Sequence, residues 1–297
     1  MKAELLCQGY GLIEGPVWDP TQGLLFSDVI HGGVFCLTGD ATVRTVFEHR
    51  RGIGGMCLHI AGGLVVSGRN LAYKPFNGGD SVTLFDRDPD HGRVGFNDIT
   101  TDAAGRIYAG ALGSSPVFED GLGPRAGNLY RIDLDGSAHV VAHDVMLTNG
   151  LAFSPDGTTL YHADSRRGTV FCYSVAADGS LGPKTPFVTC RRGMPDGLVV
   201  SEDGAVWVAL ADGGHGVAVY TAGGADRDFI DIATPMCTSV CFGGADLREL
   251  YIVSGSEGSG SERGGAIYRV PTAVAGLAVP PARVALRPGG SDAIAQG

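Results

Sequence analysis

Four polar residues stand at matching places in a sequence that repeats itself. Each opens a short apolar stretch, and each is followed by a glycine or by a second polar residue. They are Glu14 before Gly15, Asn97 before Asp98, Asn149 before Gly150, and Asp196 before Gly197. Two carboxylates and two carboxamides form a set of hard oxygen ligands, which suits Ca²⁺, Mg²⁺ or Mn²⁺ and holds Zn²⁺ or Fe²⁺ less selectively. Because no His or Cys stands at these places, a dedicated zinc site is not expected.

The charges of this set predict how it behaves with and without a cation. Two carboxylates that face each other repel, and a bound cation removes that cost and lowers their pKa values. Without a metal, Glu14 or Asp196 is expected to hold a proton. The alternative is ordinary turn chemistry, since Asn, Asp and Gly are the commonest turn residues. A single pair fits that alternative, whereas recurrence at matched positions favours a shared site.

The elements that position these residues come from an internal repeat. Six segments share a short apolar strand, a turn with Asp or Gly, and a second apolar strand, with a third strand after most of them. Their anchor residues, spaced by 40 to 52 positions, are Gly15, Gly55, Asp98, Gly150, Gly197 and Ser239. The Asp-Gly pairs in SPDGTT and SEDGAV are typical of tight hairpin turns. No segment has a sustained helical period, so helix content is expected to be minimal.

A period of about 45 residues with several strands is that of a propeller blade. We therefore predict an all-β fold, a six-bladed β-propeller forming a single domain over residues 1–297, with a central metal-binding channel. The innermost strands of such a fold begin at one end of the channel, which would bring the four polar residues together. Residues Lys2 to Gln8 are expected to complete the last blade. The insertion at 111–127 is interpreted as a flap over one end of the channel, and 254–265 as a second flexible loop.

Composition excludes several classes of protein. The 297 residues carry a net charge of −10, which disfavours nucleic acid as a partner. No apolar run reaches the ~20 residues that span a bilayer, and the N-terminus does not resemble a secretory signal. Seven scattered cysteines are an odd number and indicate reduced thiols. We expect a cytoplasmic protein with no membrane partner; the oligomeric state is left open.

Five motifs in order resemble the gluconolactonase, regucalcin and luciferin-regenerating enzyme family of six-bladed propellers. The motifs are EGPVW from Glu14, FNDITTDAAGRIYAG from Phe96, NGLAFSPDGTTLYHAD from Asn149, PDGLVVSEDGAVWVA from Pro195 and TSVCFGGADLRELYIVS from Thr238. The resemblance spans residues 10 to 270. Each motif alone is weak, and their order and spacing are specific.

The resemblance implies one divalent metal at the end of the channel, with Glu14, Asn149 and Asp196 as its ligands. It implies that Asp196 is also the general acid/base, and that Asn97, with Asp98 beside it, binds substrate or water. One position departs from the pattern. Sugar lactone hydrolases of the family commonly carry an arginine two residues before this Asn, where the present sequence has Gly95, with Arg93 two residues earlier. The missing arginine argues against a gluconolactone-shaped substrate. It does not argue against a lactone or related ester of another shape.

The sequence thus predicts a metal-dependent hydrolase that opens a small lactone, a sugar lactone or another. The metal, Ca²⁺ before Mg²⁺, Mn²⁺, Zn²⁺ or Fe²⁺, polarises the carbonyl, and Asp196 or a water on the metal supplies the base. Two alternatives stay open at this point. The same site could hydrolyse phosphotriesters or aryl esters, or the propeller could be a non-catalytic binding protein stabilised by calcium.

Overall fold

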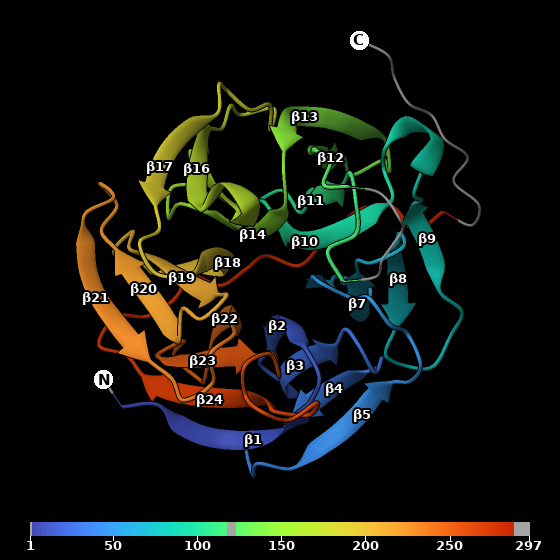
Figure 1. The fold of residues 1–297 in the computed structure, drawn as a ribbon. Helices are drawn as coiled ribbons and strands as arrows, with labels where there is room; N and C mark the ends of the chain where they lie inside the picture. The colour runs from blue at the N-terminus through green and yellow to red at the C-terminus, as the bar shows by residue number, and fades with distance from the viewer. Residues whose placement is uncertain (1, 118–122, 288–297) are drawn as a thin grey trace.

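The computed structural model describes residues 2–117 and 123–287. They form six four-stranded antiparallel sheets arranged as blades around a central axis (Figure 1). The predicted six-bladed β-propeller is therefore confirmed. Within the described ranges the helices are two 3₁₀ turns, η1 (Pro89–His91) and η2 (Ser165–Arg167). No helix of the described residues is long and apolar enough to cross a membrane.

The first strand of each blade lies next to the axis. These inner strands are β2 (Ile13–Asp19), β6 (Met56–His59), β10 (Gly95–Thr101), β14 (Thr148–Phe153), β18 (Met194–Val200) and β22 (Cys237–Gly243). The second strands are β3 (Gly23–Asp28), β7 (Gly63–Val66), β11 (Ile107–Leu112), β15 (Thr159–Asp164), β19 (Val206–Ala211) and β23 (Glu249–Ser254).

The two remaining strands of each blade lie progressively further from the axis. The third strands are β4 (Val34–Leu37), β8 (Leu71–Pro75), β12 (Gly127–Ile132), β16 (Thr169–Ser174), β20 (Gly216–Tyr220) and β24 (Gly265–Pro271). The outer strands are β5 (Val43–Phe47), β9 (Val82–Phe85), β13 (Ala138–Val145), β17 (Thr185–Thr189), β21 (Asp226–Asp231) and β1 (Glu4–Tyr10). The sequence predicted the first two strands of each blade and the third strand of most blades. Of the outer strands it predicted only the N-terminal one.

The N-terminal strand closes the ring. β1 pairs with β24, the third strand of the last blade, with Glu4 opposite Arg269. The two side chains also form an ion pair at 2.9 Å. The predicted role of Lys2 to Gln8 is confirmed, with the strand itself running from Glu4 to Tyr10.

The apolar core lies between the blades. The second strands β3 and β19 and the third strand β20 are buried along their whole length. Aromatic pairs join neighbouring blades: Trp207 packs edge-on against Phe242, and Trp18 stacks on Tyr251. Each blade buries its faces mainly against its neighbours, so the ring forms one continuous packed structure.

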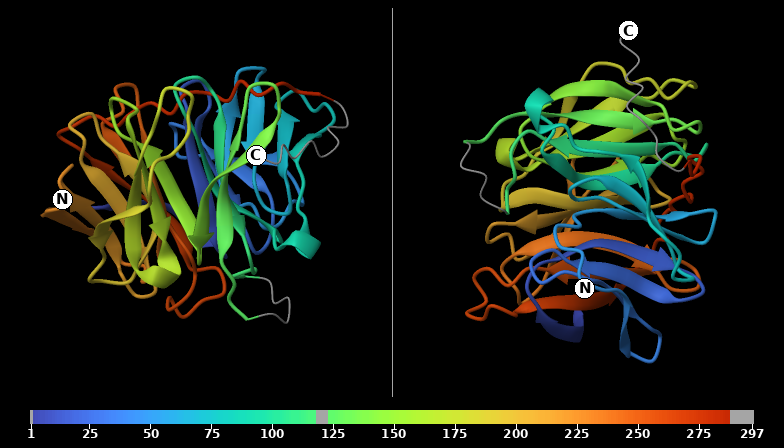
Figure 2. Two further views of the ribbon diagram at one scale, coloured as in Figure 1. Left: turned by 90° about the horizontal axis from the view of Figure 1, so that it is seen from above. Right: turned by 90° about the vertical axis from the view of Figure 1, so that its right-hand side faces the viewer.

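Strand direction distinguishes the two ends of the axis. Every inner strand begins at one end, and the turn to its second strand lies at the other. We call the first the entry end; the loops between second and third strands also lie there. Residues 272–287 cross the opposite end, where Ala282 N donates to Leu58 O at 2.7 Å and Leu277 N donates to Val200 O at 3.1 Å. The left view in Figure 2 shows this red segment along one end of the ring.

Candidate active site

The four predicted site residues lie at irregularities near the starts of inner strands. In four blades the pairing of first and second strands skips residues at the same place: after Glu14, after Phe96, after Thr148 and after Pro195. A bulge of this kind turns a side chain away from the alternation of the strand. Asn97, Asn149 and Asp196 are the first skipped residues of their blades, whereas Glu14 is the last paired residue before the skipped Gly15 and Pro16. All four residues lie near the entry end, with Glu14 one position earlier in its blade than the other three.

Glycines beside these residues let the inner strands approach one another. A β-carbon on Gly150 would lie 2.4 Å from the backbone nitrogen of Leu198, and one on Gly197 would lie 2.0 Å from Ser239 Oγ. Neither position therefore has room for a side chain. This close approach is what brings polar groups of separate blades within reach of each other.

A hydrogen-bond relay fixes the two carboxamides. Asn97 Nδ2 donates to Asn149 Oδ1 at 2.6 Å and to Thr148 O at 2.8 Å. Asn149 Nδ2 donates to Ser165 Oγ at 2.8 Å, and the Ser165 hydroxyl donates to Pro195 O at 2.6 Å. With its amide nitrogen committed to Ser165, Asn149 turns its oxygen toward Asn97.

Ser165 is a site residue that the sequence did not reveal. It lies in η2, directly after β15, and its side chain joins Asn149 to the backbone just before Asp196. The segment DSRR carries no recognisable signal, because a buried serine that orients another side chain leaves no pattern in one sequence. The contact depends on blades four and five meeting at the axis.

Three carboxylates gather at this end, one more than the predicted ligand set contains. Burial, then repulsion from Asp196 and Asp98, raises the pKa of Glu14 well above its ordinary value. Burial, then repulsion from Asp98, does the same to the pKa of Asp196. Burial raises the pKa of Asp98 to about 7. The expectation that a metal-free site holds a proton agrees with these raised pKa values.

One atom of this group has no partner. Asp196 is 6% exposed, and its Oδ1 is buried without a hydrogen-bond partner in the part of the chain that the structure describes. A buried carboxylate oxygen left unpaired costs free energy, which a bound cation would recover. The orphaned oxygen is the observation that fits the predicted metal.

The donor set fits a hard cation better than zinc. Among the described residues, no three side chains of His, Cys, Asp or Glu form a group that could hold a metal. The nearby thiols are not ready ligands, because burial raises the pKa of Cys57 to about 12 and also raises the pKa of Cys237. A site with two carboxylates and the Asn149 oxygen instead suits Ca²⁺ or Mg²⁺.

The arginine position of the resemblance cannot be filled from Gly95 or from Arg93. A β-carbon on Gly95 would lie 2.8 Å from the backbone oxygen of Gly68. Arg93 is 4% exposed, with its guanidinium 4.3 Å from the centre of the Phe85 ring. Its Nη1 also donates to the Tyr130 hydroxyl at 3.2 Å. Arg93 is therefore a packing residue of blades two and three.

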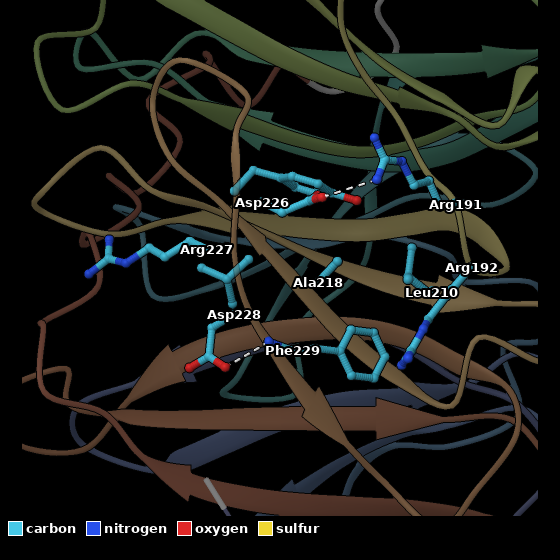
Figure 3. A pocket seen from close by; sticks show the side chains of 10 residues that line it. Arg191, Arg192, Leu210, Ala218, Asp226, Arg227, Asp228 and Phe229 are labelled. Carbon is cyan, nitrogen blue, oxygen red and sulfur yellow. Dashed lines mark hydrogen bonds and ion pairs between the residues drawn. The ribbon is translucent and has the colours of Figure 1, made fainter.

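A separate hollow lies on blade five (Figure 3). It has a volume of about 350 Å³, and neither the three carboxylates nor the two carboxamides line it. Its arginines have partners: Arg191 pairs with Asp226 at 3.6 Å, and Arg192 lies 4.4 Å from the centre of the Phe229 ring. The polar groups gathered near the axis, not this hollow, form the candidate active site.

Two predicted loops also lie at the entry end. Residues 255–264 connect β23 to β24, and the insertion lies between β11 and β12. Residues 118–122 of the insertion lie outside the described residues, so its interpretation as a flap stays a prediction.

Comparison with known proteins assigns the chain to a family. Residues 12–256 match the model of the SMP-30/Gluconolactonase/LRE-like region, and the chain belongs to this family. A 6-deoxy-6-sulfogluconolactonase of Pseudomonas putida is 33% identical, with 90% of this chain and 93% of the relative covered. A pentonolactonase of Haloferax volcanii is 29% identical, with 89% and 91% covered.

A solved structure of a luciferin-regenerating enzyme has a TM-score of 0.85 at 25% identity, with 95% of this chain and 99% of that chain covered. The resemblance drawn from the motifs is thereby confirmed. The relatives named as sugar lactonases identify the chain as a lactonase, an enzyme that hydrolyses lactones.

Proposed function

We propose that this enzyme opens a sugar lactone or a similar small lactone at the entry end, with one divalent cation held by Glu14, Asn149 and Asp196. The observation that carries the proposal is the buried, unpartnered Oδ1 of Asp196 among carboxylates whose pKa values are raised. When bound, the cation would supply Lewis acidity to the lactone carbonyl and keep the carboxylates ionised. Ca²⁺ is the first candidate, because the donors are all oxygen and include a carboxamide.

The hydrolytic step needs a base within reach of water. In the proposal, the Asp196 carboxylate accepts a proton from water as the water oxygen attacks the acyl carbon. The ring C–O bond then breaks, and the proton passes to the alkoxide oxygen that leaves. The product is an open hydroxy acid, which releases one proton at neutral pH. Proton release therefore reports the reaction directly.

The carboxamides have positioning roles in this proposal. Asn149 offers its oxygen inward because Ser165 accepts from its nitrogen. Asn97 stands between blades and orients substrate or water near the base. Asp98, whose pKa lies at about 7, is the second group that can exchange a proton close to neutral pH. We assign it to substrate binding, with its charge set by what is bound beside it.

A lactone panel on metal-stripped protein tests the proposal. The panel includes sugar γ- and δ-lactones, an aryl ester and a phosphotriester, and proton release is followed after adding Ca²⁺, Mg²⁺, Mn²⁺, Zn²⁺ or Fe²⁺. We expect little turnover without metal, recovery with Ca²⁺ or another divalent ion, and lactones as the best substrates. Full activity in chelator would overturn the metal requirement. A clear preference for the phosphotriester or the aryl ester would overturn the lactone assignment.

The same preparation gives a second test that does not depend on turnover. A cation that binds only the folded state raises the melting temperature by mass action. We expect Ca²⁺ to raise the melting temperature of the parent and to have less effect on a Glu14→Gln variant. Identical melting curves of the parent with chelator and with saturating Ca²⁺ would contradict a metal at the axis.

A further inference from the structure

One exposed arginine lies beside the candidate active site and has no role in the fold. Arg69 belongs to the loop of residues 67–70, which joins β7 to β8 at the entry end. The preceding residue, Gly68, pairs with Phe96: Gly68 N donates to Phe96 O at 3.1 Å, and Phe96 N donates to Gly68 O at 2.7 Å. Asn97 follows directly. The loop therefore holds Arg69 against the start of β10, the strand that carries Asn97 and Asp98.

This loop is rigidly held by its neighbours. Arg50 Nη2 donates to Ser67 O, to Asn70 O and to Asn70 Oδ1 at 3.1, 2.9 and 2.7 Å. Gly55 N donates to Ser67 Oγ at 2.8 Å. The backbone around Arg69 is thus fixed before any ligand arrives, which reduces the cost of ordering it on binding.

The Arg69 side chain itself has its hydrogen-bonding capacity free. It is exposed and forms no hydrogen bond or ion pair with any part of the chain that the structure describes. The Arg50 guanidinium, by contrast, is used for hydrogen bonds to the loop. A guanidinium offers five donors in a planar fork that matches a carboxylate or a similar acid group.

The corresponding loops of the next two blades also carry exposed arginines. Arg125 lies between β11 and β12, and Arg166 lies between β15 and β16; both are exposed, and their side chains are likewise unpaired among the described residues. The described residues of these three loops include four arginines, and the sequence of the blade-three loop also contains Glu119 and Asp120, which lie outside the described residues. Of the four, Arg167 is committed, pairing with Asp144 at 2.8 Å. Each of the three loops thus carries one exposed arginine whose side chain is unpaired among the described residues.

Gly95 shows how closely the loop that carries Arg69 packs on β10. A β-carbon on Gly95 would point at the same loop, 2.8 Å from Gly68 O and 3.9 Å from the Cα of Arg69. A side chain on β10 is therefore excluded at position 95. Arg69 is the residue whose side chain begins next to this point. Because Gly68 packs closely on β10, the side chain at this point comes from blade two and not from blade three.

We infer that Arg69 binds an anionic substituent of the lactone and thereby selects acidic sugar lactones over neutral ones. The inference rests on the proposed lactone hydrolysis and adds the class of substrate to it. Arg69 contacts the substrate at a point away from the carbonyl, so it acts on binding rather than on the chemical step. Arg125 and Arg166 add long-range attraction for the same anion, which salt weakens.

A matched pair of lactones tests the inference. Galactono-1,4-lactone and galactaro-1,4-lactone differ in whether the sixth carbon is a hydroxymethyl group or a carboxylate. In the parent we expect the lower KM for the anionic lactone. Arg69→Ala should raise that KM roughly 10- to 100-fold, as loss of charge-assisted hydrogen bonds does. We expect kcat, and the KM for the neutral lactone, to change by less than about threefold. Arg69→Lys should retain part of the preference.

The control is Arg44→Ala, which removes an equally exposed arginine from the outer strand of blade one. It should leave both KM values unchanged. An Arg69→Ala variant that raises both KM values equally, or neither, would overturn the inference while the parent's lactonase activity keeps the proposed function intact. A parent that hydrolyses no lactone would overturn the proposed function, and the inference with it.

Discussion

Two aspartates at opposite ends of the ring, Asp156 and Asp196, are used in opposite ways. In the turn between β14 and β15, opposite the entry end, Asp156 accepts from Ser154 Oγ at 2.6 Å and from Thr158 N at 3.0 Å. These bonds, that of Ser154 first, lower the pKa of Asp156 to about 2. At the entry end, Asp196 keeps an oxygen without a partner, and burial raises its pKa. The satisfied carboxylate of Asp156 holds its turn together, and the unsatisfied one of Asp196 lies where a ligand can pair it.

The backbone repeats the same contrast. Opposite the entry end, residues 272–287 add backbone hydrogen bonds to several blades, and Ala282 is fully buried against them. At the entry end, bulges interrupt the inner strands directly after Glu14 and at Asn97, Asn149 and Asp196. The end opposite the entry end thus adds stability to the fold. The entry end carries the electrostatic cost of the buried carboxylates. Substitutions at one end should therefore change activity, and substitutions at the other should change stability.

The largest expected effect is on the rate and follows from Asp196→Asn. Asn can still offer an oxygen to a cation, but it cannot accept a proton near neutral pH. We expect turnover of the best lactone to fall by roughly 10²–10⁴ at saturating metal. The melting temperature without metal should not fall, because a repelling charge has been removed.

The matched control is Asp156→Asn, the same change at the opposite end. It should leave turnover unchanged. If Asp196→Asn stays within about threefold of the parent, Asp196 is a ligand and not the base. Asp98→Asn would then be the next variant to assay.

The second expected effect concerns the pH dependence of stability in the metal-free protein. Asp98, with a pKa of about 7 instead of 3.8, holds a proton in the folded state that the unfolded chain has released. The free energy of unfolding should therefore fall as pH rises from about 4 to about 7. A pKa that differs by one between the folded and unfolded states corresponds to about 1.4 kcal/mol. Glu14 and Asp196 act in the same direction.

The measurement is the difference in the free energy of unfolding between the parent and Asp98→Asn across this pH range. The difference is needed because His162 contributes the opposite slope: burial lowers its pKa to about 3, so its contribution to stability is lost as pH falls below 6.5. In Asp98→Asn the fall with rising pH should be smaller than in the parent. Parallel curves for the two proteins would show that Asp98 is ionised throughout.

The repeat explains why so much of the entry end was predictable. Strand direction in a propeller brings equivalent positions together, so four residues at matched positions imply one site. Asp98 was predicted as a substrate-binding neighbour of Asn97, but its electrostatic coupling to Glu14 and Asp196 depends on distances across the axis. Likewise, the exclusion of a side chain at Gly95 depends on the loop of another blade.

The parts that sequence did not predict lack apolar patterning. The outer strands are partly exposed, as in β17 (Thr185–Thr189), where burial supplies no alternation to detect. Residues 272–287 contain no regular strand and are held by backbone hydrogen bonds, which any sequence can form. Ser165 acts through one contact between blades. In each case tertiary packing decides the structure.

The third prediction concerns a substitution at Gly54 that displaces the Asn97 side chain and leaves Asn97 itself in the sequence. A β-carbon on Gly54 would lie 2.0 Å from Asn97 Oδ1. Because that oxygen ends a side chain that can rotate, Gly54→Ala should displace the carboxamide and break its bond to Asn149, at little cost to the fold. We expect kcat/KM to fall roughly 10- to 100-fold, the scale of a misplaced catalytic group. Unchanged kinetics would contradict a positioning role for Asn97.

The smallest expected effect is on stability and comes from the opposite end. A β-carbon on Gly276 would lie 2.0 Å from the Phe242 ring, whose side chain is buried against Trp207 and cannot move freely. Gly276→Ala should therefore cost roughly 1–3 kcal/mol, as overpacking does, and lower the melting temperature by a few degrees. Gly39→Ala is its control, because a β-carbon there has no atom within 4 Å. Turnover should stay near the parent value in both variants, since neither touches the entry end. A loss of turnover in Gly276→Ala at a temperature where it remains folded would mean that the two ends are coupled through blade six, and the division between a stabilising end and a reacting end would fail.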